Sequence, residues 1–311
     1  MAVRARLIYN PSSGREEIKK KLPEVLDRLE RGGIETSCHA TIGEGDATLA
    51  AIDAVEREFD IIIAAGGDGT LYEVVNGMAE KAFKPKLGIL PLGTSNDFAR
   101  AVGIPKNWEY ACDLITQQHS KAIDLGKMNN RYFINIAGGG SMTELTYEVP
   151  SKLKTIIGQL AYYIKGLEKL PRLRPIEINL RSEEMNFHDE VMMFLIANSN
   201  SVGGVELVAP NASLQDGKLD VFVFKKCNLA EFIKIVSIAL RGEQIIDPHV
   251  VHFQSKRIEI TSPDYVQINL DGELGGILSS TFSILPSHIN VIVDEEENPA
   301  YRMKNGVTLL K

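Results

Sequence analysis

The chain is poor in cysteine and has no long apolar run, and both shortages limit what the protein can be. Its 311 residues include three cysteines, Cys38, Cys112 and Cys227, which are far apart and lack metal-ligand spacing. We therefore expect packed free thiols in a reducing, cytoplasmic environment. No apolar run approaches the ~20 residues of a spanning helix, and the N-terminal residues enter a strand pattern without a signal-peptide core. Any membrane role is expected to be peripheral, at the inner face of the membrane.

The chain also has no excess of positive charge. Its formal net charge of −7 argues against general nucleic-acid binding. A hydrophobic content of 44% and a charged content of 24% are ordinary for a globular protein. With 311 residues, the chain is long enough for two domains, each with its own core.

Two common phosphate-binding fingerprints, Gly-x-x-x-x-Gly-Lys-Ser/Thr and Gly-x-Gly-x-x-Gly, do not occur in the sequence. Instead, Gly66-Gly67-Asp68-Gly69-Thr70 follows the apolar run 60–65 and precedes apolar residues at helical spacing over 71–78. A short apolar run bounded by glycine predicts a buried parallel strand. The glycines are therefore expected at a strand-to-helix turn, where the backbone can approach a phosphate and the helix N-terminus offers free N–H groups.

Alternating strand and helix patterns predict a Rossmann-like parallel α/β domain over residues 1–122. The expected strands are 6–10, 34–41, 60–65 and 87–92, and the expected helices are 15–31, 46–58 and 71–78. Three loops, 10–14, 66–70 and 93–97, follow strands of this domain. Because the carboxyl ends of parallel strands meet at one edge of a sheet, we expect the loops to converge there. Each loop by itself is also consistent with an ordinary turn.

The same loops carry carboxylates but no lysine. Asp68 and Asp97 lie in them beside Ser, Thr and Asn side chains. Mg²⁺ in phosphate sites is commonly held by few carboxylates, retained waters and substrate phosphates. We therefore expect Asp68 and Asp97 to organise, through water, a catalytic Mg²⁺ that neutralises the phosphate charge in place of the missing lysine.

Residues 123–289 predict a second, β-rich domain. Strand-like runs are separated by tight turns, which is typical of an antiparallel β-sandwich, and helical patterns occur at 151–169 and 228–240. The segment Leu270-Asp271-Gly272-Glu273 could be a hairpin turn with exposed acids. Alternatively, Asp271 or Glu273 could accept a proton from a hydroxyl nucleophile in a cleft between the domains.

A local excess of basic residues falls at 151–175, where six Lys or Arg side chains accompany one Glu. Apolar residues recur there at helical spacing, as in a basic amphipathic helix lying on an anionic membrane surface. The alternative is a surface helix that packs on its own domain.

Three motifs resemble one known family. Gly66 to Thr70 with Glu73, then Pro91-Leu92-Gly93-Thr94-Ser95-Asn96-Asp97-Phe98-Ala99-Arg100, and finally Leu270 to Glu273 resemble the catalytic domain of the diacylglycerol kinases, a family of lipid kinases. The resemblance covers nearly the whole chain and is strongest to the soluble bacterial members. The glycine motif alone is shared with NAD kinases and 6-phosphofructokinases, whereas Gly-Thr-x-Asn-Asp-Phe is more specific to lipid kinases.

The resemblance implies ATP-dependent phosphorylation of 1,2-diacylglycerol to phosphatidic acid with Mg²⁺, in a cleft between two domains. It implies a base at Asp271 or Glu273, and a structural Mg²⁺ bound by the Asp216 carboxylate and the carbonyl groups of Ser213 and Lys218. It further implies that the segment of about 290–311 returns to the first domain, that the protein contacts diacylglycerol and anionic lipids at the membrane, and often that it forms a homodimer. The implied nucleotide-binding residues are Asn10, Pro11, Ser12, Ser13, Gly14, Thr41, Gly66, Gly67, Asp68, Gly69, Thr70, Glu73 and Thr94.

One residue departs from the family pattern, because Tyr72 stands where an Asn is usual. Two other functions remain open from the sequence. A phosphotransferase similar to NAD kinase would use a soluble acceptor, and a nucleotide or lipid sensor would bind without catalysis.

Overall fold

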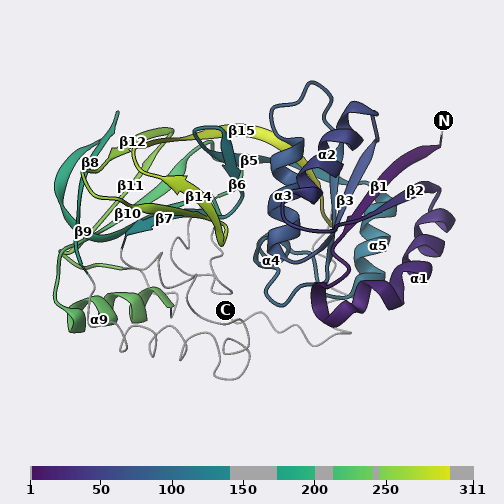
Figure 1. Ribbon diagram of the computed structural model, residues 1–311, viewed down its shortest axis with the longest axis horizontal. Coiled ribbons are helices and arrows are strands. Elements are labelled where there is room, and N and C mark those ends of the chain that lie inside the picture. The colour runs from purple at the N-terminus through teal and green to yellow at the C-terminus, as the bar shows by residue number, and fades with distance from the viewer. Residues whose placement is uncertain (1, 141–173, 200–212, 241–244, 295–311) are drawn as a thin grey trace.

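The computed structural model describes residues 2–140, 174–199, 213–240 and 245–294. The expected basic helix at 151–169 lies outside the described residues. Figure 1 shows an α/β domain beside a β-rich domain, with one long strand, β15 (Ser280–Ile292), running from one to the other.

The α/β domain is built on four parallel strands in the order β4-β3-β1-β2. These strands are β1 (Val3–Tyr9), β2 (Ile34–Ala40), β3 (Ile61–Gly66) and β4 (Lys86–Pro91). The whole of β3 is buried, as its uninterrupted apolar run predicts. The predicted parallel sheet is therefore confirmed, with strand boundaries within a few residues of the expected ones.

Helices cover this sheet in two pairs. The helix α2 (Asp46–Glu56) packs on α3 (Asp68–Met78), and α1 (Glu17–Arg31) packs on α5 (Trp108–Gln117). The connection through α1 leads from β1 to β2, at the edge of the sheet. The connections through α2, from β2 to β3, and through α3, from β3 to β4, lead across the sheet in the opposite direction. Right-handed crossovers therefore put the two pairs on different sides, as Figure 1 shows. A 3₁₀ turn, η1 (Ser13–Glu16), replaces the expected first turn of α1, and the short α4 (Asp97–Ala101) follows β4.

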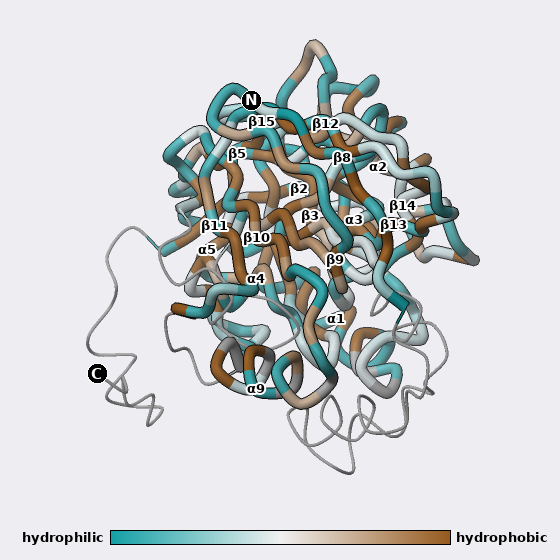
Figure 2. Tube along the Cα trace, turned by 90° about the vertical axis from the view of Figure 1, so that its left-hand side faces the viewer, coloured by the Kyte–Doolittle hydropathy of each residue, from teal (hydrophilic) through white to brown (hydrophobic). Residues whose placement is uncertain are grey.

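The β-rich domain is an antiparallel sandwich, as expected. The central β9 (Asn186–Ala197) pairs with three strands, β7 (Ile136–Gly140), β8 (Ile176–Ser182) and β10 (Leu219–Lys225). Its other strands are β11 (Val250–Ser255), β12 (Arg257–Thr261), β13 (Gln267–Leu270) and β14 (Glu273–Ile277), of which β11 and β14 each pair with one strand. The predicted helix at 228–240 is α9 (Leu229–Leu240), whose Phe232 and Ile235 are buried. In Figure 2, hydrophobic stretches lie along the strands at the centre of the view, around β10.

Two strands link the domains. β5 (Ser120–Met128) runs antiparallel to β15 along most of its length, and β6 (Arg131–Phe133) turns back on β5. After an irregularity between Leu285 and Ile289, β15 pairs in parallel with β4 at Asn290 and Val291. One continuous sheet thus spans both domains, so backbone hydrogen bonds between strands help to fix how the domains are placed relative to each other.

The three cysteines are free thiols, as expected from their spacing. Within the described parts of the chain, no helix is both long and apolar enough to span a bilayer.

Candidate active site

The glycine turn between β3 and α3 lies against two other loops. A Cβ atom added to Gly93 would lie 2.4 Å from the Cα atom of Gly67, so only backbones without side chains can approach so closely. A Cβ atom on Gly14, whose φ is +54°, would lie 2.0 Å from the carbonyl oxygen of Leu92. The loops after β1, β3 and β4 therefore meet at one edge of the parallel sheet.

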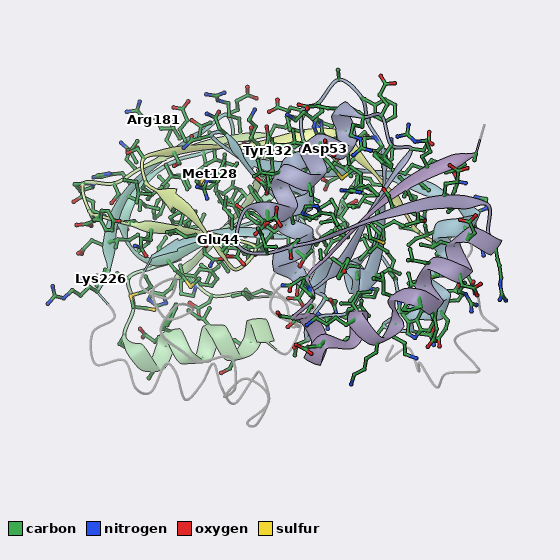
Figure 3. The ribbon with its side chains drawn as sticks, turned by 45° about the vertical axis from the view of Figure 1, so that its right-hand side comes forward. Glu44, Asp53, Met128, Tyr132, Arg181 and Lys226 are labelled. Carbon is green, nitrogen blue, oxygen red and sulfur yellow. The ribbon has the colours of Figure 1, made fainter. Side chains whose placement is uncertain are left out.

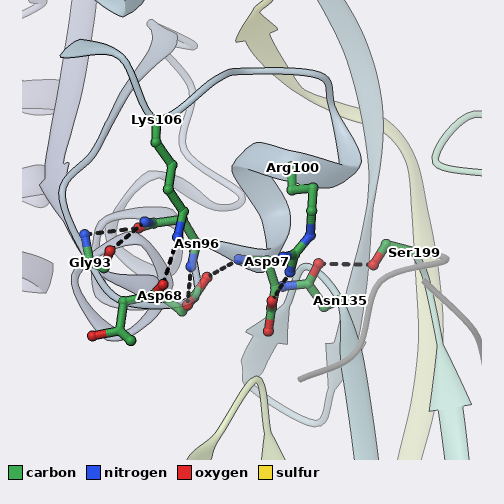
Figure 4. A network of polar contacts seen from close by, with 9 residues as sticks. Asp68, Gly93, Asn96, Asp97, Arg100, Lys106, Asn135 and Ser199 are labelled. Carbon is green, nitrogen blue, oxygen red and sulfur yellow. Dashed lines mark hydrogen bonds and ion pairs between the residues drawn. The ribbon is translucent and has the colours of Figure 1, made fainter. Parts of the chain in front are cut away.

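Asp68, the first residue of α3, ties the glycine turn to the loop after β4. Its Oδ2 accepts the backbone N–H of Asn96 at 2.9 Å, and its Oδ1 accepts that of Asp97 at 2.7 Å. The Asn96 side chain closes the loop, because its Oδ1 accepts from the Gly93 N–H and its Nδ2 donates to the Gly93 carbonyl (Figure 4). Both oxygens of Asp68 thus already hold backbone groups.

Two cationic side chains lie beside the loop at 93–97, which itself carries none. The Arg100 guanidinium forms an ion pair with the Asp97 carboxylate one turn along α4 (Figure 4). The Lys106 ammonium group donates to the Thr94 carbonyl at 2.8 Å. The structure therefore supplies positive charge next to Asp97 that the loop sequence alone does not predict.

Asp271 lies in the predicted hairpin turn, between β13 and β14. Its φ of +52° and the φ of +101° at Gly272 place both residues in the left-handed region that such turns require. The Asp271 carboxylate does not point into solvent. Its Oδ2 accepts the N–H of Ile134 at 2.6 Å, and its Oδ1 accepts those of Asn135 and Ile136 at 2.8 and 2.9 Å. Asp271 therefore fixes the chain between β6 and β7.

Burial raises the pKa of Asp271 to about 6, although the three N–H groups oppose this increase. The negative charge of Asp68 raises it further. The two carboxylates therefore interact electrostatically from opposite sides of the domain boundary.

Glu273, the first residue of β14, faces the glycine turn. A Cβ atom on Gly69 would lie 3.0 Å from Glu273 Oε1, so the missing side chain at Gly69 leaves the room that this carboxylate uses. Burial and the negative charges of Glu44 and Glu73 raise the pKa of Glu273. The β-rich domain thus presents a carboxylate to the N-terminus of α3.

A cavity of ≈ 460 Å³ opens at this point. Its lining combines the α/β domain with one residue of the β-rich domain, Glu273. The lining residues are Asn10, Ser12, Thr41, Ile42, Gly43, Glu44, Ala47, Gly69, Thr70, Glu73 and Glu273. Seven of these were singled out from the sequence.

The remaining predicted site residues surround this cavity or lie apart from it. Those outside its lining are Pro11, Ser13, Gly14, Gly66, Gly67, Asp68, Thr94, Asp97, Ser213, Asp216, Lys218 and Asp271. Residues 42–44 and Ala47 were not predicted. The available signal was the position of this segment after β2, a fourth strand that ends at the same edge of the sheet.

Glu73 has a role in the architecture of this cavity. Its two carboxylate oxygens accept the N–H groups of Gly45 and Ala47, each at 3.0 Å. These groups belong to the start of α2, where a helix has unpaired donors. Glu73 therefore holds the cavity wall formed by residues 42–47 against α3.

A second acidic cluster lies at the loop before β10, which contains Ser213, Asp216 and Lys218. Asp216 Oδ1 accepts the Lys218 N–H at 3.0 Å. Burial, together with the nearby charges of Asp220 and Asp124, raises the pKa of Asp216. Asp216 itself is exposed, whereas Asp124 and Asp220 are buried. A cation would offset the repulsion among these three carboxylates, so the donor set fits a divalent metal ion.

Across the described ranges, three or more His, Cys, Asp or Glu residues nowhere gather closely enough to ligate a metal directly. Near the glycine turn, carboxylates are nevertheless in excess, and two of them, Asp271 and Glu273, have raised pKa values. These observations fit a cation that is held partly through water and substrate.

Comparisons with protein families agree with this two-domain arrangement. Residues 4–128 match the diacylglycerol kinase catalytic domain. Residues 144–293 match the YegS C-terminal NAD kinase beta sandwich-like domain. The two matches fall on the α/β domain and on the β-rich domain.

Known proteins resemble the chain over almost its full length. A diacylglycerol kinase of Bacillus subtilis (strain 168) is 53% identical over 295 residues, which cover 94% of this chain and 97% of that protein. A diacylglycerol kinase of Staphylococcus haemolyticus is 48% identical over 308 residues, covering 97% and 93%. A crystal structure of a diacylglycerol kinase from Bacillus anthracis str. Sterne is 28% identical, has a TM-score of 0.80 and covers 94% of this chain and 98% of that one. The chain therefore belongs to the diacylglycerol kinase family.

Proposed function

We propose that the protein transfers the γ-phosphoryl group of ATP to the hydroxyl group of 1,2-diacylglycerol, giving phosphatidic acid and ADP. The observation that carries the proposal is the position of Glu273, whose carboxylate faces the glycine turn at Gly69 across a cavity shared by two domains. Phosphoryl transfer needs positioned phosphates, charge balance and an acceptor for the proton of the nucleophile. Family membership is consistent with this chemistry.

The nucleotide would lie in the cavity of ≈ 460 Å³. Gly69 and Thr70, in the first turn of α3, line that space, and the start of a helix has unpaired N–H groups. The glycines of 66–70 would allow phosphates to approach the backbone. Asn10, Ser12 and Thr41 would add polar contacts from neighbouring loops. The other predicted nucleotide contacts, in 11–14 and at Thr94, would shape the loops around this space.

A divalent cation, which we take to be Mg²⁺, suits this cavity. Its lining includes Glu44, Glu73 and Glu273 but no Lys or Arg, so a bound triphosphate would meet uncompensated negative charge. Both oxygens of Asp68 accept backbone N–H groups, which favours contact between Asp68 and the ion through water, as for Asp97. The bound ion would supply charge neutralisation to the phosphoryl oxygens.

We assign the role of base to Glu273 rather than Asp271. Three of the four acceptor positions of the Asp271 carboxylate are taken by backbone N–H groups. Glu273 lines the cavity, and its raised pKa brings it closer to that of an effective base. In this scheme Glu273 accepts the proton of the lipid hydroxyl, and Asp271 holds the neighbouring backbone and adds negative charge beside Asp68.

A second, structural Mg²⁺ would bind the Asp216 carboxylate and the carbonyl groups of Ser213 and Lys218. The support is the raised pKa of Asp216 among the charges of Asp124 and Asp220. Such an ion would stabilise the loop that precedes β10 and would not touch the substrate.

The acceptor lies in a membrane, so the protein would bind peripherally at the inner face of the membrane and contact anionic lipids. The support is the basic composition of 151–175, where six Lys or Arg residues accompany one Glu. A homodimer is part of the same proposal and rests on the resemblance to the family.

The test is a product assay with labelled ATP and two acceptors, diacylglycerol in mixed micelles and NAD. Label in phosphatidic acid, lost in Glu273→Gln, is the expected result. Label in an NAD product would replace the lipid kinase with the NAD kinase alternative. ATP binding without turnover on either acceptor would instead support the sensor.

A further inference from the structure

Helix α3 carries the glycine turn at its N-terminus and also docks onto the β-rich domain. The Tyr72 side chain is only 8% exposed and belongs to the apolar cluster of the β-rich domain, together with Met128, Phe133 and Leu270. Every other described member of that cluster comes from Met128 or later in the chain. The Tyr72 ring therefore anchors α3 in the core of the neighbouring domain.

One turn further along α3, the Asn76 carboxamide binds the backbone of β6. Asn76 Nδ2 donates to the Tyr132 carbonyl at 3.1 Å, and the Tyr132 N–H donates to Asn76 Oδ1 at 3.1 Å. Nδ2 also donates to the Tyr72 carbonyl of its own helix at 2.9 Å, which fixes the orientation of the carboxamide. Figure 3 places Tyr132 at the boundary between α3 and the strands of the β-rich domain.

This contact completes the open edge of a short strand. Among the described strands, β6 pairs with β5 alone, so its other edge has no partner strand. A side-chain carboxamide has the donor and the acceptor of a peptide group. Asn76 therefore binds Tyr132 as a neighbouring strand would, and it joins α3 to the main chain of β6.

The chain that follows β6 holds the hairpin of the candidate base. Two positions after Tyr132 begins the segment 134–136, whose three N–H groups donate to the Asp271 carboxylate at 2.6, 2.8 and 2.9 Å. The Asp271 N–H in turn donates to the Ile136 carbonyl at 2.9 Å. Glu273 follows Asp271 by two positions, so the same bonds fix where its backbone lies.

A second hydrogen bond joins β6 to this hairpin. Arg131 Nη1 donates to the Leu274 carbonyl at 2.7 Å, and Leu274 directly follows Glu273 in the chain. Hydrogen bonds and short chain segments therefore lead from Asn76 through β6 to both sides of Glu273.

We propose that Asn76 is a positioning residue, which sets the Glu273 carboxylate over the glycine turn by docking β6 onto α3. Both sides of the site depend on this joint, because Gly69 lies in the first turn of α3 and β6 leads to the hairpin of Glu273. This inference rests on the proposed kinase function, and Asn76 itself does not line the cavity. A displacement of about 1 Å at a reacting group can lower a rate by about 100-fold, so the joint controls kcat.

The key variant is Asn76→Ala, which removes both bonds to Tyr132 and keeps the helix, because Ala is the strongest helix former. The matched control is His288→Ala. His288 Nε2 accepts the Glu80 N–H at 2.9 Å, just beyond the end of α3, so this variant cuts a bond between the same helix region and β15 that does not lead to the hairpin. We expect Asn76→Ala to lower kcat by about 10- to 100-fold with the KM for ATP changed by less than about twofold. We expect His288→Ala to change kcat by less than about twofold.

Each variant is assayed below the onset of its own thermal unfolding, so that kcat describes folded protein. Asn76→Asp is a second variant of nearly the same size, for the case that Asn76→Ala does not fold. It keeps the acceptor for the Tyr132 N–H and replaces the donor with an oxygen, and we expect a similar loss in kcat.

A double variant separates positioning from a general weakening of the interface. We expect Asn76→Ala combined with Asp271→Asn to lose no more kcat than Asp271→Asn alone, since both changes break one series of bonds. Equal kcat values for Asn76→Ala and His288→Ala, a loss confined to the KM for ATP, or independent losses that multiply in the double variant would overturn the positioning role. A wild-type protein that makes no phosphatidic acid would instead overturn the proposed function.

Discussion

Replacing Asp271 with Asn should change how stability depends on pH. The folded protein raises the pKa of this carboxyl group from an ordinary 3.8 to about 6, so the folded state binds a proton more tightly than the unfolded chain does. The stabilisation that the folded protein gains from binding this proton is fully present below pH 3.8 and is lost as the pH rises through about 6. At neutral pH the ionised Asp271 therefore lowers the free energy of unfolding.

The magnitude follows from the two pKa values. They differ by about two, and each pKa unit corresponds to about 1.4 kcal/mol, which gives a change of about 3 kcal/mol as an upper value. In Asp271→Asn, the side-chain NH2 group replaces one carboxylate oxygen. At least one of the three backbone N–H groups that bond to the carboxylate then loses its acceptor, at a cost of about 1–3 kcal/mol. That cost does not depend on pH, whereas the contribution of the proton does.

The assay is denaturant unfolding of the wild type and Asp271→Asn between pH 4 and pH 8. The variant should gain up to about 3 kcal/mol relative to the wild type as the pH rises through about 6. The control is Asp53→Asn, at an exposed residue of α2 that pairs with Arg57. A constant difference between the wild type and Asp271→Asn across this range would refute the argument, because the carboxyl group would then have no altered affinity for protons.

Three further predictions concern catalysis and membrane binding. Asp68→Ala should lower kcat at saturating Mg²⁺ by about 100-fold or more. The circular dichroism spectrum should stay unchanged, because the two hydrogen bonds that are lost join loop backbone and remove no contact of the apolar core. Retained kcat would contradict the role of Asp68. Glu273→Gln should lower kcat by about 100- to 10,000-fold with ATP binding retained, as measured by calorimetry, and a loss of binding alone would count against a base. Charge reversal at Lys152 and Lys154 should weaken sedimentation with anionic vesicles, with a smaller loss at high salt. Unchanged sedimentation at low salt would exclude that surface.

Local patterns predicted much of the fold. Apolar runs bounded by glycine predicted β3 and β4, because a strand buried on both faces has no room for polar residues. The Asp271-Gly272 pair predicted a hairpin, because both positions require a positive φ. The helix α5 and the strands β7, β11 and β14 were not predicted from the sequence. β7 and β14 are rich in glycine, which weakens the alternation on which strand prediction depends.

The cavity wall at 42–47 was missed for a different reason. These residues have no motif of their own, and they become part of the cavity because Glu73 on α3 holds the start of α2. Tyr72 was recognised as a departure from the family pattern. Its contacts with the core of the other domain depend on how the domains pack, and no local pattern encodes them.

The sequence by itself determined that three loops with glycine, two of them with an aspartate, end strands of one parallel sheet, because chain order and the handedness of crossovers fix where those ends lie. Only the tertiary structure decided what each acid does there. It directs Asp271 to the N–H of Ile134, which precedes it by 137 positions, and it brings Glu273 to Gly69. Contacts between residues so far apart arise from the joint packing of both domains along β5 and β15, which no single segment of the chain specifies.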